Sequence, residues 1–369
     1  MWNYYNPVDI IFGANKFDNL SLLLNKKKYI IVTHPEEIFQ KYTDVLINTA
    51  NPPLMIMTEV QANPDYNDIL SLIEKFSDIN DIDCIVAIGG GSVTDTAKAL
   101  AAFKDKKNLL TNFVRNKEVP QVDNPIDIIA IPTTSGTSSE ITCWATIWDK
   151  EMNNKLSLAH RDLYPKIAII DPTIMLAKPK ALTVSTGLDA LSHSMESIWN
   201  INANPISAMH GIAGAKMILE NLPKLANDLQ NLELRSNVAM ACVHAGLAFS
   251  NTKTAISHNI SYPITLQYGI QHGIACSFSL PYVMRSMKGV NKLAEERLEK
   301  ILNNDLDKSS TILLEELRSL AIPLNLNELK ITKQDWDTIV TDAFEGERGK
   351  NFLGNKNAFD RACEEMKVF

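Results

Sequence analysis

The stretch IVAIGGGSVTDTAKAL, residues 85–100, joins an unbroken apolar run to three glycines and then to a helical pattern. Short apolar runs rich in Ile and Val are typical of strands buried on both faces of a parallel sheet. Comparable runs are YIIVT at 29–33, IDIIAI at 126–131 and KIAIID at 166–171. Helical patterns at 67–78 and 94–103 alternate with these runs, so we predict a parallel-sheet α/β domain.

The second half of the chain has a different pattern. From about Thr183 onward the strand signal disappears, and helical stretches such as GLDALSHSMESIW and ELRSNVAMACVHAGLAF follow one another. A chain of 369 residues exceeds the size at which a single hydrophobic core usually stops growing. We therefore predict an α/β domain at 1–178 and an all-helical domain at 179–369, with the boundary in the proline-bearing segment IDPTIMLAKPKAL.

Composition and charge limit the classes of function. Hydrophobic residues make up 45% of the chain and charged residues 21%, as in an ordinary globular enzyme. The formal net charge of -7 argues against a nucleic-acid partner, and no apolar run is long enough to cross a bilayer. The start of the chain lacks the pattern of a secretory signal peptide. The five cysteines are scattered and include no CxxC pair, so we expect a cytoplasmic protein with reduced thiols.

Two turns in the α/β half have features of nucleotide-binding loops. In the first, Gly90 and Gly91 would let the backbone approach a pyrophosphate closely, at the start of a helix whose free N–H groups favour anions. The pattern is neither GxGxxG nor a P-loop, so a merely structural strand-to-helix turn stays an alternative. The second turn is PTTSGTSSEIT at 132–142, again after a predicted strand. Its hydroxyls suit a nucleotide at the same sheet edge, although a plain Ser- and Thr-rich loop looks the same.

Four residues of the helical half have the chemistry of a metal site. Asp189 and His193 are four residues apart in a helical pattern, so both side chains should leave one helix face. His258 lies in a second helical run, and His272 follows a stretch that we expect Pro263 and Gly269 to break. One carboxylate and three imidazoles suit a divalent transition metal. Any single histidine is more often a surface or core residue than a ligand.

Taken together, these motifs resemble those of the iron-containing (group III) alcohol dehydrogenase family. The resemblance covers nearly the whole chain, and the motifs occur in the family's order: GGGSVTDTAK, PTTSGTSSE, GLDALSH, FSN followed by His258, and QHG. It implies a Rossmann-like NAD(P)-binding domain, a helical metal-binding domain and an active site between them. It also implies hydride transfer between the nicotinamide and a substrate whose oxygen the metal polarises. The expected metal is Fe²⁺, with Zn²⁺ as the alternative, and the expected assembly is a homo-oligomer, such as a dimer.

The resemblance assigns site residues position by position. The implied metal ligands are Asp189, His193, His258 and His272. The implied cofactor-binding residues are Gly90, Gly91, Ser92 and Asp95 in the first loop, Thr133, Thr134 and Ser139 in the second, and Lys155 nearby.

Two positions depart from the family's pattern. Many relatives have a histidine four residues after the third ligand, where this chain has Tyr262, whose phenol is a candidate proton relay. NAD-preferring relatives commonly have an aspartate after the second strand, where this chain has His34, followed by Glu36 and Glu37. The choice between NAD and NADP therefore stays open.

The segment before His258, FSNTKTAISH, suggests a substrate class. Lys253 lies a little over one helical turn before His258 and would pair with an anionic substrate group, with Asn202, Asn204 or Arg348 as helpers. The run LSHSMESIWNINANPIS, together with AISHNISYPIT, also resembles the branch of the family that reduces phosphonoacetaldehyde or sulfoacetaldehyde. A solvated surface lysine is the simpler interpretation, and an unspecialised short-chain alcohol dehydrogenase acting on neutral substrates is the main rival function. A lyase similar to dehydroquinate synthase is a more distant alternative.

Overall fold

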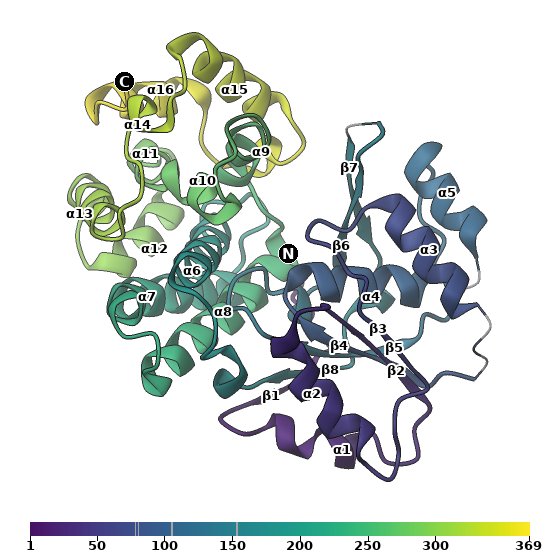
Figure 1. Cartoon of the computed structure of the whole chain (residues 1–369). Coiled ribbons are helices and arrows are strands. Elements are labelled where there is room, and N and C mark those ends of the chain that lie inside the picture. Colours follow the sequence, from purple (N-terminus) through teal and green to yellow (C-terminus); the bar gives the residue numbers. More distant parts are fainter. Residues whose placement is uncertain (78, 80, 105, 153) are drawn as a thin grey trace. The chain divides into compact units, whose positions relative to one another are not determined.

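The computed structural model describes residues 1–77, 79, 81–104, 106–152 and 154–369, which form two compact units (Figure 1). The sheet unit comprises Asn6–Thr134 and Ser139–Met175. The helical unit comprises Met1–Tyr5, Ser135–Ser138 and Leu176–Phe369. An α/β fold followed by an all-helical one is therefore confirmed, while the division into domains at 1–178 and 179–369 stays a prediction.

The sheet unit is built on six parallel strands in the order β1-β8-β5-β4-β2-β3. Their bounds are β1 Asp9–Phe12, β2 Tyr29–Thr33, β3 Met55–Met57, β4 Cys84–Gly89, β5 Asp127–Pro132 and β8 Ile167–Ile170. Every residue of β2 and β4 is buried, which explains why their sequences are apolar without alternation. In the β4–β5 register Gly89 lies beside Pro132, so the two candidate cofactor loops leave neighbouring strands at the same sheet edge.

Helices cover this sheet, and a hairpin extends from it (Figure 1). The helices are α1 Leu20–Leu23, α2 Glu37–Ile47, α3 Tyr66–Phe76, α4 Gly91–Phe103 and α5 Lys107–Arg115, with short 3-10 turns η1 Phe17–Asn19, η2 Ser139–Ile141, η3 Arg161–Leu163 and η4 Pro172–Met175. The antiparallel hairpin pairs β6 Trp144–Asp149 with β7 Asn154–Ala159. Sequence patterns did not predict this hairpin, because β6 buries only alternate residues and β7 only one.

The helical unit contains no strand in the part of it that the structure describes. Its helices are α6 Lys180–Glu196, α7 Pro205–Asn227, α8 Leu232–Thr252, α9 Ile256–Tyr268, α10 His272–Phe278, α11 Leu280–Ser286, α12 Lys292–Leu302, α13 Leu306–Ser319, α14 Leu326–Leu329, α15 Lys333–Glu345 and α16 Lys356–Glu365, with η5 Gly349–Asn351. Trp199, Trp336 and Phe359 are among the largest side chains of its core. No described helix combines the length and the apolar character that crossing a membrane requires.

The helix that carries His258 differs from the prediction. We expected Pro263 to break the chain, but α9 continues through Pro263 to Tyr268, losing only the hydrogen bond that residue 263 cannot donate. The helix ends at Gly269, whose φ of 69° is the left-handed conformation that glycine adopts without a steric penalty. His272 is then the first residue of α10 rather than part of an isolated turn.

Candidate active site

The cluster in the helical unit begins with α6, which presents two polar side chains to its interior. Asp189 and His193 are one helical turn apart, and they are only 4% and 6% exposed. The start of α10 lies directly against α6: a Cβ on Gly273 would come within 1.8 Å of the carbonyl oxygen of Ser185. Only a glycine permits this approach, so Gly273 brings the neighbouring His272 to the face of α6 that carries Asp189.

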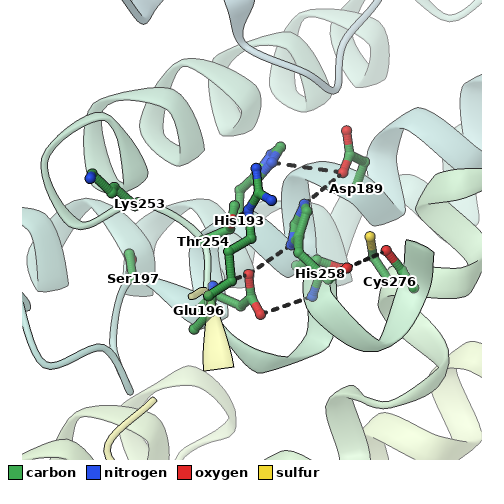
Figure 2. A network of polar contacts seen from close by, with 12 residues as sticks. Asp189, His193, Glu196, Ser197, Lys253, Thr254, His258 and Cys276 are labelled. Atoms are coloured by element: carbon green, nitrogen blue, oxygen red, sulfur yellow. Dashed lines mark hydrogen bonds and ion pairs between the residues drawn. The ribbon is translucent and has the colours of Figure 1, made fainter. Parts of the chain in front are cut away.

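Three imidazoles converge on one carboxylate oxygen, and Figure 2 shows two of them, His193 and His258, beside Asp189. The distances from Asp189 Oδ1 to the Nε2 atoms are 3.4 Å for His258, 3.8 Å for His193 and 3.9 Å for His272. Nitrogen and oxygen ligands of a tetrahedral metal lie about 3.4 Å apart, given metal–ligand distances near 2.1 Å. The four donors implied by the family resemblance therefore have spacing that a metal ion fits.

The unused hydrogen-bonding capacity of the cluster also suits a bound cation. Among the described side chains, Asp189 Oδ1 and His258 Nε2 are buried without a hydrogen-bond partner. A buried carboxylate oxygen and a buried ring nitrogen are costly to leave unpaired. A divalent metal would bind both atoms. Otherwise His258 Nε2 and Asp189 Oδ1 would have to share a proton across 3.4 Å, which is long for a hydrogen bond.

The ionisable side chains of the cluster shift one another's pKa values. Burial alone would raise the pKa of Asp189, but the neighbouring histidines hold it well below its usual range. Burial lowers the pKa of His193 to about 4, so this imidazole is neutral at pH 7 with a free lone pair. Burial also opposes the charge on His258, yet Cys276, Glu196 and Asp189 together raise its pKa well above the usual value. A metal that binds here would therefore displace a proton from His258.

Glu196 orients His258 and was missed by the sequence analysis. Its carboxylate lies 2.7 Å from His258 Nδ1 and accepts hydrogen bonds from the backbone N–H groups of Ala255 and His258. These contacts cap the start of α9 and place the Nδ1 proton of His258 toward Glu196, leaving Nε2 to face Asp189. Glu196 is two turns after Asp189 on α6, so helical spacing alone could have indicated it.

Cys276 is a second residue that the sequence analysis did not assign. It lies one turn after His272 on α10, with Sγ 3.6 Å from His272 Nε2. The donor atoms of Asp189, His258, His272 and Cys276 all lie within 4.8 Å of one another. Burial alone would raise the pKa of the thiol, but the charges on His258 and His272 outweigh it and lower the pKa to about 7.

A stack of three side chains leads from the cluster to a cation. The ring of Tyr262 lies parallel to that of His272, with 5.8 Å between centroids, and the guanidinium of Arg348 lies 5.0 Å from the Tyr262 ring. Arg348 Nε donates to Thr254 Oγ1 at 2.9 Å. In the described chain no carboxylate forms an ion pair with Arg348. The guanidinium therefore has no carboxylate partner among the described residues, and the Tyr262 ring lies between it and His272, the one partly exposed histidine of the cluster.

The structure does not bring Lys253 to this cluster. We expected it on the helix of His258, but α8 ends at Thr252 and Lys253 follows with a φ of 64°, before α9 begins at Ile256. Its side chain is exposed and points away from the histidines (Figure 2). Two of the three suggested helpers are engaged elsewhere: Asn204 caps α7, and Asn202 donates to Thr252 O.

The first candidate cofactor loop has the form that the glycines predict. Gly90 precedes α4 and makes no side-chain cap, and Gly91 is the first residue of the helix. The N–H groups of the first helical turn have no intrahelical acceptor and suit an anion. Ser92 Oγ accepts from the backbone of Asn63. A Cβ on Gly89 would lie 2.5 Å from Val93, whereas one on Gly90 would find Thr134 at 3.3 Å, so only Gly89 is required for packing.

The second loop is held to the first by buried polar groups. Thr133 donates its backbone N–H to Gly89 O, and Ser139 Oγ donates to Asp95 Oδ1 at 2.7 Å. Lys98, which the sequence analysis did not single out, is fully buried and donates to Ser139 O and Trp144 O. Burial lowers the pKa of Lys98 to about 8. Asp95 and Ser139 therefore stabilise the loop structure, in addition to their predicted contact with the cofactor.

Two further predicted cofactor residues lie in the sheet unit. Lys155 is on β7 with its ammonium 5.3 Å from the Trp148 ring centre. His34 immediately follows β2, and its Nδ1 lies 3.2 Å from Val60 O. Glu36 and Glu37 at the start of α2 are exposed. The roles of all these residues stay predictions.

Comparison with protein families gives two matches. Residues 7–172 match the model of the iron-containing alcohol dehydrogenases, and residues 183–361 match that of the C-terminal part of the Fe-containing alcohol dehydrogenase family.

Individual relatives cover almost the whole chain. An NAD-dependent methanol dehydrogenase of Bacillus methanolicus is 28% identical, with 94% of each chain covered. An NADPH-dependent butanol dehydrogenase of Clostridium saccharobutylicum is also 28% identical and covers 100% of this chain and 97% of its own. Among solved structures, sulfoacetaldehyde reductase from Bifidobacterium kashiwanohense in complex with NAD⁺ superposes with a TM-score of 0.90 at 26% identity, covering 100% of this chain and 98% of that one.

Proposed function

Because this chain belongs to the iron-containing alcohol dehydrogenase family, we propose that it reduces a small aldehyde carrying an anionic head group, with NAD(P)H as hydride donor. Phosphonoacetaldehyde and sulfoacetaldehyde are the substrates that fit this description, and the hydroxyethyl compounds are the products. The observation that carries the proposal is the guanidinium of Arg348, which pairs with no described carboxylate and lies over the ring of Tyr262, itself stacked on His272. The similarity to a sulfoacetaldehyde reductase supports the same substrate class.

The proposed metal ligands are Asp189, His193, His258 and His272. A bound Fe²⁺ or Zn²⁺ would act as a Lewis acid toward the substrate oxygen. The chain's own contribution is to hold these donors in place: Glu196 fixes the ring of His258, and Gly273 brings His272 against α6. The partly exposed edge of His272 is the side from which we expect the substrate to approach.

Arg348 is the residue that we expect to bind the anionic head group of such a substrate. The Nε–H group is used by Thr254, so the terminal nitrogens of the guanidinium are available for a phosphonate or sulfonate. The segment that carries Arg348 is packed tightly, since a Cβ on Gly349 would lie 2.0 Å from Ala343 O. A fixed guanidinium suits a tetrahedral oxyanion better than a mobile ammonium does. We therefore assign anion recognition to Arg348 in place of Lys253.

A second candidate function is the oxidation of neutral short-chain alcohols. The methanol and butanol dehydrogenases at 28% identity favour it. In that case Arg348 would serve only to hold Thr254 and Tyr262, and the charge of the substrate would not affect the rate.

Substrate kinetics separate the two functions. We would measure kcat/KM for phosphonoacetaldehyde, sulfoacetaldehyde, propanal and butanal with the wild type, Arg348→Met and, as a matched control, the exposed Lys253→Met. Losing a hydrogen-bonded charge partner at a desolvated site costs about 2 to 5 kcal/mol, so Arg348→Met should lower kcat/KM for the anionic aldehydes by about thirtyfold or more. Propanal and butanal should be little affected, and Lys253→Met should resemble the wild type.

Three results would change the assignment. A selective loss in Lys253→Met would return the role to that lysine. Equal losses for charged and neutral aldehydes in Arg348→Met would make the arginine structural. A wild type that prefers butanal would favour the second function.

A further inference from the structure

The cluster on α6, α9 and α10 contains five donors, one more than a tetrahedral metal site needs. Four of them are the predicted ligands, and the fifth is the thiol of Cys276. Cys276 is fully buried, as are the nearby unpartnered atoms Asp189 Oδ1 and His258 Nε2. Figure 2 shows Cys276 beside His258, on the side opposite His193.

Distances distinguish a ligand from a neighbour. With a metal–sulfur bond near 2.3 Å and a metal–nitrogen bond near 2.1 Å, a tetrahedral site places sulfur and nitrogen about 3.6 Å apart. The distance from Cys276 Sγ to His272 Nε2 is 3.6 Å. The donor atoms of Cys276, Asp189, His258 and His272 all lie within 4.8 Å of one another, and this compact group does not include His193.

The surroundings of His193 point the same way. Its ring is stacked in parallel on Phe249, with 3.9 Å between centroids, and on His258 at 4.6 Å. Moving Nε2 toward a shared ion would require that stack to shift. Cys276 has no such restraint, because rotation about a single side-chain bond moves its sulfur.

We propose that the Cys276 thiolate is a further metal ligand of this chain, beside the four ligands proposed above, and that it lies closest to Asp189, His258 and His272 among them. This inference rests on the proposed metal-dependent function. A thiolate is softer than imidazole or carboxylate, so Cys276 shifts the preference of the site from Fe²⁺ toward Zn²⁺.

Cobalt substitution tests the proposal without any substrate. The full-length protein, freed of metal and loaded with Co²⁺ under anaerobic conditions, should show a sulfur-to-cobalt charge-transfer band in the near ultraviolet. Cys276→Ser should bind Co²⁺ without that band and bind Zn²⁺ at least about tenfold more weakly. Cys242→Ser, which removes another buried thiol of the helical unit, should keep the band. His193→Ala should also keep it, because Cys276, Asp189, His258 and His272 remain as donors.

Different results would contradict the role of Cys276 and the proposed metal-dependent function. Bound Co²⁺ without the charge-transfer band in the wild type would overturn the role of Cys276 and leave the metal site in place. A band that persists in Cys276→Ser would do the same. A wild type that binds no Co²⁺ would overturn the metal site and the proposed function together. If Cys276→Ser does not fold, loss of the band in Cys276→Ala and its retention in His193→Ala decide the question.

Discussion

The candidate metal site of the helical unit consists of side chains, whereas the candidate cofactor loops of the sheet unit consist mainly of backbone. Asp189 and the three histidines contribute atoms whose hydrogen-bonding capacity is partly unused. The loop at Gly90 contributes N–H groups and space, while its polar neighbours Asp95, Lys98 and Ser139 satisfy one another. A side-chain site should fail when an atom is removed, and a backbone site should fail when an atom is added.

The largest expected effect comes from deleting a donor. His272→Ala should abolish stoichiometric metal binding and lower turnover by about a thousandfold or more, since a Lewis acid contributes several kcal/mol. His272 is partly exposed, so the fold should survive. His258→Ala should lose metal equally and also melt at lower temperature, because the buried carboxylate of Glu196 would lose its imidazole partner. Metal content and thermal melting measure both effects, with His160→Ala as control; full metal occupancy in His272→Ala would contradict the site.

A smaller effect should follow from altering the group that orients His258. Glu196→Gln keeps the size of the side chain but turns one acceptor into an N–H donor, which would face the donors of Ala255 and His258. Loss of such an outer partner typically lowers metal affinity by about 10- to 100-fold. Competition with a chelator measures the affinity. Unchanged affinity would mean that Glu196 serves only to cap α9.

The glycine loop should respond to added atoms. Gly90→Val places a side chain where the backbone should meet a pyrophosphate, so the cofactor dissociation constant should rise by at least about tenfold with the fold intact. Gly89→Ala would instead clash with Val93 and should lower the free energy of unfolding by about 1 to 3 kcal/mol. Cofactor titration and urea unfolding separate the two. Unchanged cofactor binding in Gly90→Val would make the turn merely structural.

The smallest effect concerns pH. Burial raises the pKa of Glu140, next to Ser139 in the second loop, from 4.5 to about 7. Because the folded state holds this proton more tightly than the unfolded state, stability should fall as pH rises from 4.5 to 7 and then stay low. Glu140→Gln should remove this slope and add about 1 to 3 kcal/mol at pH 8, with little change at pH 4. Urea unfolding at both pH values measures it; equal gains at both would exclude titration as the cause.

Sequence patterns predicted an element correctly where the residues of that element alone define its structure. Unbroken apolar runs predicted β2, β4, β5 and β8, because strands buried on both faces need no polar positions. The spacing of Asp189 and His193 predicted a shared helix face, and α6 provides it. The edge strands β1 and β3 and the hairpin β6–β7 were missed, since short or half-buried strands have weak patterns.

Residue patterns along the chain were enough to predict the order of the two folds, the two glycine- and threonine-rich loops and the four metal ligands. The other side chains around these four were identified from contacts between distant segments. Glu196 meets His258 across 62 residues, and Arg348 meets Thr254 across 94. Lys253 leaves the site because its backbone turns to a φ of 64° between two helices, which spacing along the chain does not show. Local periodicity predicts which side chains share one face of a helix. Contacts between helices depend on how closely the helices pack, and Gly273 permits the close packing of α10 on α6.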